Sequence, residues 1–82
     1  MPVYHINVHD GSNIPDRHGT DLPNLWAARR EGVMLAARVL LDGPDKFWES
    51  TDWHVDVTNA ARLILFPLDF SATDSPALVS AY

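Results

Sequence analysis

The 82-residue sequence has no cysteine, few basic residues and no long apolar run. Without cysteine there can be no disulfide, no thiolate metal site and no cysteine nucleophile. Six basic residues stand against eleven acids, and the net charge of −5 argues against general nucleic-acid or anionic-membrane binding. No apolar segment approaches the roughly 18 residues that a membrane-spanning helix requires. We therefore expect partners that are neither nucleic acids nor membranes.

Signatures of catalysis and of cofactor binding are also absent from the sequence. No serine lies in a G-x-S-x-G turn, and the four glycines are too isolated to form a phosphate-binding loop. The chain starts with an alternating strand pattern instead of a signal peptide, which favours the cytoplasm. We expect one small domain without enzymatic activity or cofactor. A domain of this size without disulfides often gains stability by oligomerisation.

The longest periodic segment runs from Asn24 to Asp42 and predicts a helix of about five turns. Its apolar stripe recurs at spacings of three and four, at Leu25, Ala28, Gly32, Leu35, Ala36 and Val39. Asn24 is a candidate N-cap, and Gly43-Pro44 predicts the end of the helix. A glycine on the stripe, Gly32, predicts that a strand or a large aromatic side chain crosses close to the helix.

The residues off the stripe predict what the outer surface of this helix carries. Arg29, Arg30 and Arg38 lie there, so we expect that surface to be solvated and locally basic. The chain is also rich in large aromatics for its length. For these we expect core packing in preference to a stacking platform for bases, and they are Trp26, Phe47, Trp48 and Trp53.

Two segments alternate between apolar and polar residues, as half-buried strands do. In the segment from Val3 to His9, Tyr4, Ile6 and Val8 should face the helix, and a short strand near Ile14 could pair back onto it. The segment from Trp53 to Thr58 should turn three residues inward, Trp53, Val55 and Val57, and three outward, His54, Asp56 and Thr58. A turn at Asn59–Arg62, with Asn59 able to take positive φ, would join it to the next strand.

The segment from Leu63 to Leu68 is apolar at successive positions, which is typical of a strand buried on both faces. We predict an α+β fold: a small antiparallel sheet of three to four strands, in the order strand, optional short strand, helix, strand, strand, with one long helix on one face. Residues 1–70 would form the domain and residues 71–82 a C-terminal tail, with a loop and one helical turn around Asp45–Glu49 after the helix.

One helix covers only one face of a sheet, so the second face needs another cover. The chain's own tail offers four apolar residues near it, Phe70, Leu78, Val79 and Tyr82. A second copy of the chain is the alternative, and we favour a symmetric homodimer because exposed apolar sheet surface usually marks an interaction site. The predicted interface residues are Leu63, Leu65, Phe66, Leu68 and Phe70.

Histidines and a carboxylate on the outward faces of the two alternating strands form a weak candidate metal site. If the strands are neighbours, His5, His9, His54 and Asp56 could come within about 5 to 8 Å of one another. However, His5 and His9 stand about 13 Å apart along one strand, too far to share an ion without help from a neighbour. Ordinary outward-facing strand residues therefore explain the pattern better.

The order and spacing of several short motifs resemble a family of short bacterial proteins with a domain of unknown function. The shared features are a strand ending in Asp-Gly, an Asp-x-x-Gly-x-x-Leu-Pro segment, an alanine-rich helix and a Trp-led hairpin. The matching residues are Tyr4, Asp10, Gly11, Asp16, Gly19, Leu22, Pro23, Ala27, Ala28, Trp53 and Val57. Asn7 departs from the histidine that many members carry. The resemblance implies the fold and no particular activity.

The element order is also similar, more loosely, to HicB-type antitoxins, although the chain lacks their additional DNA-binding module. Three hypotheses follow for the function. The first is a non-enzymatic interaction module that self-associates through a sheet face or edge. The alternatives are an antitoxin-like protein that binds a protein partner, and a small metal-binding protein that uses the strand histidines.

Overall fold

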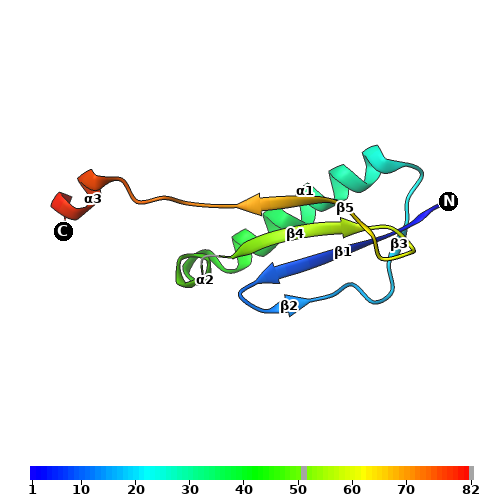
Figure 1. Cartoon of the computed structure of the whole chain (residues 1–82), viewed down its shortest axis with the longest axis horizontal. Helices are drawn as coiled ribbons and strands as arrows, with labels where there is room; N and C mark the ends of the chain where they lie inside the picture. Colours follow the sequence, from blue (N-terminus) through cyan, green and yellow to red (C-terminus); the bar gives the residue numbers. More distant parts are fainter. Residues whose placement is uncertain (51, 82) are drawn as a thin grey trace.

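The computed structural model describes residues 1–50 and 52–81, except for the side chains of residues 79–81. The fold is α+β, as predicted: one antiparallel sheet carries the long helix α1 on one face (Figure 1). The strand order is β2-β1-β4-β5, and β3 pairs with β1 beside β2. No helix among the described residues is both long enough and apolar enough to cross a bilayer.

Helix α1 spans Leu25–Asp42 and begins and ends where the sequence predicts. The Asn24 side chain caps it, because its Oδ1 accepts a hydrogen bond from the Ala27 N–H at 2.9 Å. At the other end, the Gly43 N–H donates to the Val39 carbonyl at 3.2 Å. The proline after it then starts the short helix α2, Pro44–Glu49, in which the proline occupies the first turn.

Strand β1, Val3–Asp10, pairs with β4, Trp53–Thr58, on one side. Its other side is shared by two short strands, β2 at Asn13–Ile14 and β3 at Thr20–Asp21. The hairpin through Ile14 is confirmed, whereas β3 is an addition to the predicted elements. A strand of two residues is too short to show an alternating pattern, so no sequence pattern predicts β3.

The side chain of Asp16 fills the gap between β2 and β3 along the outer edge of β1. Its Oδ2 accepts from the Ile6 N–H at 3.1 Å, and its Oδ1 accepts from the N–H groups of His18 and Gly19 at 3.3 and 3.0 Å. Burial raises the pKa of Asp16, but the hydrogen bonds from Gly19, Ile6 and His18 and the nearby His5 outweigh burial and hold it below its usual value. Gly19 has φ of 76°, and a Cβ there would lie 2.6 Å from Val3 Cγ1, so this loop requires a glycine.

The core lies between α1 and the sheet, in two adjoining clusters. Tyr4, Ala28 and Val57 form the centre of one, and Val8, Ala36 and Val55 form the centre of the other. The inward residues predicted for both strands are confirmed, since Trp53, Val55 and Val57 are buried and Ile6 packs against both clusters. Gly32 allows the close approach that was predicted, because a Cβ there would lie 3.3 Å from Leu68 Cδ1 and 3.5 Å from Val57 Cγ2.

Strand β5, Ile64–Phe70, is the outermost strand of the sheet. In the single chain it is not covered on both faces, which differs from the expectation for its apolar run. Pro67 gives the physical reason: a proline lacks the N–H that a strand paired on both sides would use, so it favours an edge position.

In the turn before β5, Arg62 takes the positive φ, 65°, in place of Asn59. Asn59 instead accepts hydrogen bonds from Ala61 and Leu63 through its side chain.

After β5 the chain continues as an arm that ends in helix α3, Pro76–Ala81. Figure 1 shows this arm running on beyond the sheet, and the molecule measures 53 Å along its long axis against 22 and 21 Å across. The backbone of the arm therefore does not fold back over the sheet in the single chain. The side chains of Val79 and Tyr82, two of the apolar tail residues considered as a cover, lie outside the described residues.

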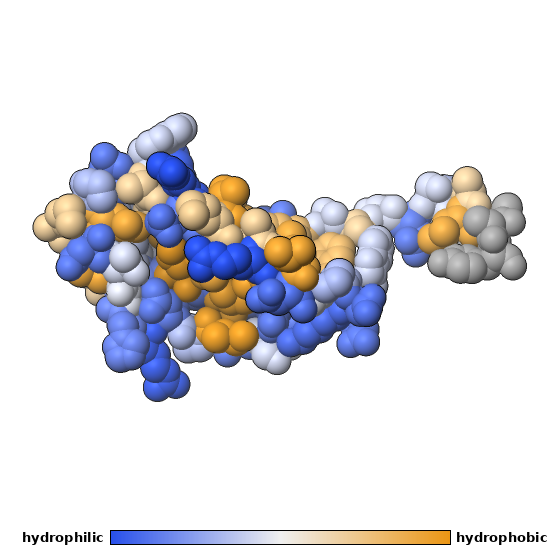
Figure 2. Space-filling model, turned by 180° about the vertical axis from the view of Figure 1, so that it is seen from behind, coloured by the Kyte–Doolittle hydropathy of each residue, from blue (hydrophilic) through white to orange (hydrophobic). Residues whose placement is uncertain are grey.

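The outer surface of α1 is less polar than predicted. Trp26 is 73% exposed, and Val33 and Met34 are exposed beside it, between Arg29 and Arg30. Figure 2, which views the molecule from the α1 side, shows hydrophobic and hydrophilic side chains interleaved there. The expectation that the aromatics pack in the core is confirmed for Trp53 and wrong for Trp26 and for Trp48, which is also exposed. Phe47 packs edge-on against Trp53 at the end of the core.

Candidate functional site

The face of the sheet opposite α1 carries a row of polar side chains. The β1–β4 register places three pairs side by side, His5 with Thr58, Asn7 with Asp56, and His9 with His54. Asp56 and Thr58 face outward, as the alternation predicted, but both are buried. The reason is that β4 is an inner strand, so side chains of β1 on one side and of β5 on the other enclose them.

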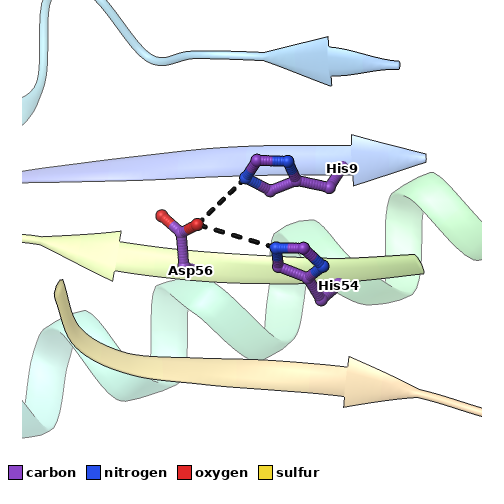
Figure 3. Close-up of side chains that lie close together, drawn as sticks. All are labelled: His9, His54 and Asp56. Atoms are coloured by element: carbon purple, nitrogen blue, oxygen red, sulfur yellow. Dashed lines mark hydrogen bonds and ion pairs between the residues drawn. The ribbon is translucent and has the colours of Figure 1, made fainter. Parts of the chain in front are cut away.

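Three of these side chains converge into one cluster, His9, His54 and Asp56 (Figure 3). One oxygen of Asp56, Oδ2, lies 3.0 Å from His9 Nε2 and 3.8 Å from His54 Nε2. The two imidazole rings stack with centroids 4.0 Å apart. The candidate ligand atoms of the three residues all lie within 4.8 Å of one another. Two imidazoles and a carboxylate at such distances can share a proton or bind a cation.

A second set of contacts orients the cluster. Asn7 Nδ2 donates to the other oxygen of Asp56, Oδ1, at 2.7 Å, and Asn7 Oδ1 accepts from the Asp16 N–H at 2.9 Å. On the opposite side, Asp52 Oδ1 lies 2.9 Å from Nδ1 of His54. The contacts from Asn7 and Asp52 occupy Asp56 Oδ1 and His54 Nδ1, the atoms that face away from the cluster centre. Asp56 Oδ2 and His54 Nε2 therefore remain directed toward it.

His5, the fourth residue of the predicted set, does not join the cluster. Its ring is buried at the other end of the strand, where Nδ1 lies 2.8 Å from the Asp16 carbonyl oxygen. The separation argued from strand geometry therefore holds for His5 and His9. What brings a second imidazole to His9 is the neighbouring strand, because His54 is its direct register partner.

The sequence analysis assigned no role to Asp52, and it noted Asp16 only as a residue of the Asp-x-x-Gly-x-x-Leu-Pro segment. Two signals in the sequence point to them. Asp52 precedes His54 by two positions, the spacing that puts side chains on one face of an extended segment. Asp16 opens the Asp-x-x-Gly motif, in which its side chain accepts a hydrogen bond from the Gly19 N–H.

The residues predicted as an interface separate into two groups. Phe66, Leu68 and Phe70 are half-buried, and each packs against the core under α1. Leu63 and Leu65 are 64% and 41% exposed, and Ile64 between them is 65% exposed. Leu65 also borders an apolar groove of about 570 Å³ formed with Pro2, Val3, Tyr4, Leu25 and residues 59–61. We refer to Leu63, Ile64 and Leu65 as the β5 start.

Fold and site together define a small α+β domain with one helix on the sheet, a polar cluster on the open face and an exposed apolar edge. The model of a family described as a domain of unknown function, DUF6894, matches residues 3–71, and the chain belongs to this family. The resemblance drawn from the motifs is thereby confirmed. No curated protein and no solved structure matches the chain.

Proposed function

We propose that the chain is a non-enzymatic interaction module that self-associates through β5. The observation that carries this proposal is that β5 is an outermost strand whose first residues are exposed and apolar. An unpaired strand edge presents N–H and C=O groups that can pair with another strand. The β5 start adds apolar surface, whose removal from water contributes about 25 cal/mol per Å².

A second copy of the chain is the partner that fits this surface best. Two β5 strands can pair antiparallel about a two-fold axis, so that each β5 start meets its own counterpart. Each chain has a net charge of −5, but the segment from Asn59 to Leu68 contains no carboxylate and one arginine. Association at this segment therefore keeps the acidic groups of the two copies out of the interface.

Two features set the extent of such a pairing. Pro67 cannot donate a backbone hydrogen bond, so a continuous ladder is limited to the residues before it. The β4–β5 pairing is also irregular next to the β5 start, where a register shift lies between Val57 and Thr58. Irregular edges of this kind limit indefinite strand addition. The expected product is a closed dimer held by a few strand pairs and the apolar side chains, not a fibre.

The mass of the protein in solution tests this proposal. We expect light scattering after size exclusion at about 50 µM to give twice the chain mass of 9.2 kDa. The double variant Leu63→Lys and Ile64→Lys should weaken association at least tenfold, because burying each leucine-sized side chain contributes about 1.5 to 3 kcal/mol. The matched control is Val33→Lys with Leu41→Lys, which adds the same charge at exposed positions of α1.

A monomeric wild-type protein at this concentration would contradict the proposal. So would a dimer that the α1 control variant disrupts and the β5 variant does not. A monomer would instead favour the antitoxin-like alternative, in which the exposed edge binds a different protein. Circular dichroism of each variant separates a loss of association from a loss of folding.

A further inference from the structure

We propose that His9, His54 and Asp56 form a binding site for a divalent transition metal of the zinc class. This inference stands apart from self-association, because the cluster lies on the open face of β1 and β4 and not at the edge of β5. Zinc is bound in proteins by imidazole nitrogen and carboxylate oxygen, and a site with three protein ligands keeps a position for water or another small ligand. The imidazole-rich set disfavours magnesium and calcium, which prefer oxygen ligands.

The spacing of the ligand atoms is close to what a zinc ion requires. With zinc–ligand bonds of about 2.0 to 2.2 Å, adjacent ligands of a tetrahedral ion lie about 3.3 to 3.6 Å apart. The Asp56 Oδ2 distances to His9 Nε2 and His54 Nε2, 3.0 and 3.8 Å, lie on either side of that range. The separations among the three ligand atoms reach at most 4.8 Å. Because the two rings stack with an interplanar angle of 17°, at least one imidazole must turn out of the stack before both Nε2 lone pairs can point at one ion.

The contacts around the cluster resemble the outer shell of a metal site. Asp52 contacts Nδ1 of His54, the ring nitrogen opposite the one that faces the cluster. Histidine ligands commonly make such a contact with a carboxylate, which fixes the orientation of the ring and increases its basicity. Asn7 occupies Asp56 Oδ1 and leaves Oδ2 for the ion. Asn7 is itself fixed by the Asp16 N–H, so the support extends from the cluster to the 15–19 loop.

The cluster is also accessible and surrounded by acidic groups. The side chains of His9 and His54 are 25% and 22% exposed, whereas that of Asp56 is 11% exposed. A hollow bordered by His9, residues 11–13, Ser50 and Asp52 opens beside it and provides a path for the ion and for a water ligand. Asp69 of β5 lies opposite His54 in the register, so a further carboxylate lies beside the site. These charges attract a cation.

The same distances also fit a purely structural network in which His9 donates a hydrogen bond to Asp56. The two interpretations differ in what added metal does. A structural network takes up no zinc at this position. A metal site takes up one equivalent per chain, and the bound ion raises the stability of the folded state, since it binds the folded chain in preference to the unfolded one.

The test uses the full chain without a histidine tag, treated with a chelator and then dialysed. Titration calorimetry with Zn²⁺ should give one equivalent per chain, and thermal unfolding should shift upward with Zn²⁺ but not with Mg²⁺. Co²⁺ should produce visible absorption bands of a low-coordinate nitrogen and oxygen site. The variants His9→Gln and His54→Gln should each abolish binding. His18→Gln is the matched control, because the His18 side chain is exposed and only its backbone N–H bonds to Asp16 in the 15–19 loop.

Asp52→Asn gives a second and milder test. The Asp52 side chain is 78% exposed, so the variant should fold normally, yet zinc affinity should fall by about 10 to 100-fold if Asp52 orients a ligand. Wild-type protein that takes up no Zn²⁺ would overturn the proposal. Uptake that survives both His9→Gln and His54→Gln, or that disappears in His18→Gln, would also overturn it. Equal binding by the β5 variant Leu63→Lys with Ile64→Lys would show that the site works independently of association.

Discussion

The Asp16 side chain stabilises the outer edge of β1. It accepts hydrogen bonds that the backbone carbonyls of a longer neighbouring strand would otherwise accept. It accepts hydrogen bonds from three backbone N–H groups, those of Ile6, His18 and Gly19. An amide cannot replace all of these acceptors. We expect Asp16→Asn to lower the free energy of unfolding by about 1 to 3 kcal/mol at pH 7. Urea unfolding measures this, with Asp21→Asn, an exposed aspartate of β3, as the control.

The lowered pKa of Asp16 also predicts how the difference in unfolding free energy between wild type and Asp16→Asn depends on pH. A carboxyl whose pKa is lower in the folded than in the unfolded chain contributes stability above its unfolded value of about 4. That contribution is lost as the pH falls through the lower, folded-state pKa. The gap in stability between wild type and Asp16→Asn should therefore narrow between pH 5 and pH 2. If the difference in unfolding free energy stays constant over this range, the negative charge of Asp16 does not strengthen its hydrogen bonds to these N–H groups.

Sequence reasoning found several residues at this scale and misjudged others. The cap at Asn24 and the inward residues of β1 and β4 follow from spacing alone. Spacing also put His54 and Asp56 on one face of their strand, but their meeting with His9 depends on the pairing of β1 with β4. The role of Arg62 in the turn was missed, because asparagine tolerates positive φ more readily than arginine and is the natural expectation. The exposure of Trp26 was missed because core packing was expected of all the large aromatics together, although Trp26 lies off the apolar stripe of the helix.

At the scale of elements, the packing of α1 on the sheet depends on a small residue at position 32. A Cβ there would meet the tip of Leu68 at 3.3 Å, a contact that a small shift of a half-buried edge-strand side chain can relieve. Gly32→Ala should therefore be close to neutral, since about 1 kcal/mol of helix propensity offsets the tight contact. Gly32→Leu should destabilise by about 1 to 3 kcal/mol, because its larger side chain forces α1 away from β4 and β5.

Thermal or urea unfolding of the Gly32 series checks this prediction. Ala37→Leu provides the control, because Ala37 is exposed on the same helix and a leucine there meets solvent. Its stability should stay within about 0.5 kcal/mol of wild type. A Gly32→Leu variant as stable as the control would mean that α1 and the sheet do not approach as closely as the structure places them.

At the scale of the whole molecule, the C-terminal arm extends beyond the sheet, and α3 is its last element. A chain ending at residue 74 removes α3 and keeps residues 71–74, some of which border a hollow with Phe47 and Trp48 of α2. We expect this shortened chain to unfold within about 2 °C of wild type by calorimetry, because a change of 1 kcal/mol corresponds to about 4 to 8 °C for a domain of this size. A larger drop in the unfolding temperature, at a concentration where the full and the shortened chain are in the same association state, would show that α3 packs on the domain. If the drop occurs only where the chains associate, α3 contacts a second copy.

The amino-acid sequence by itself determined the long helix, the longer strands and the inward faces of β1 and β4, because periodicity, capping and turn residues act over a few positions along the chain. Only the tertiary structure decided which polar residues meet. His9 and His54 are 45 positions apart in the sequence, and they become neighbours through the register of β1 against β4, which depends on packing across the whole sheet. The edge position of β5 and the course of the arm are decided at the same level, since both depend on which surfaces the remainder of the chain leaves uncovered.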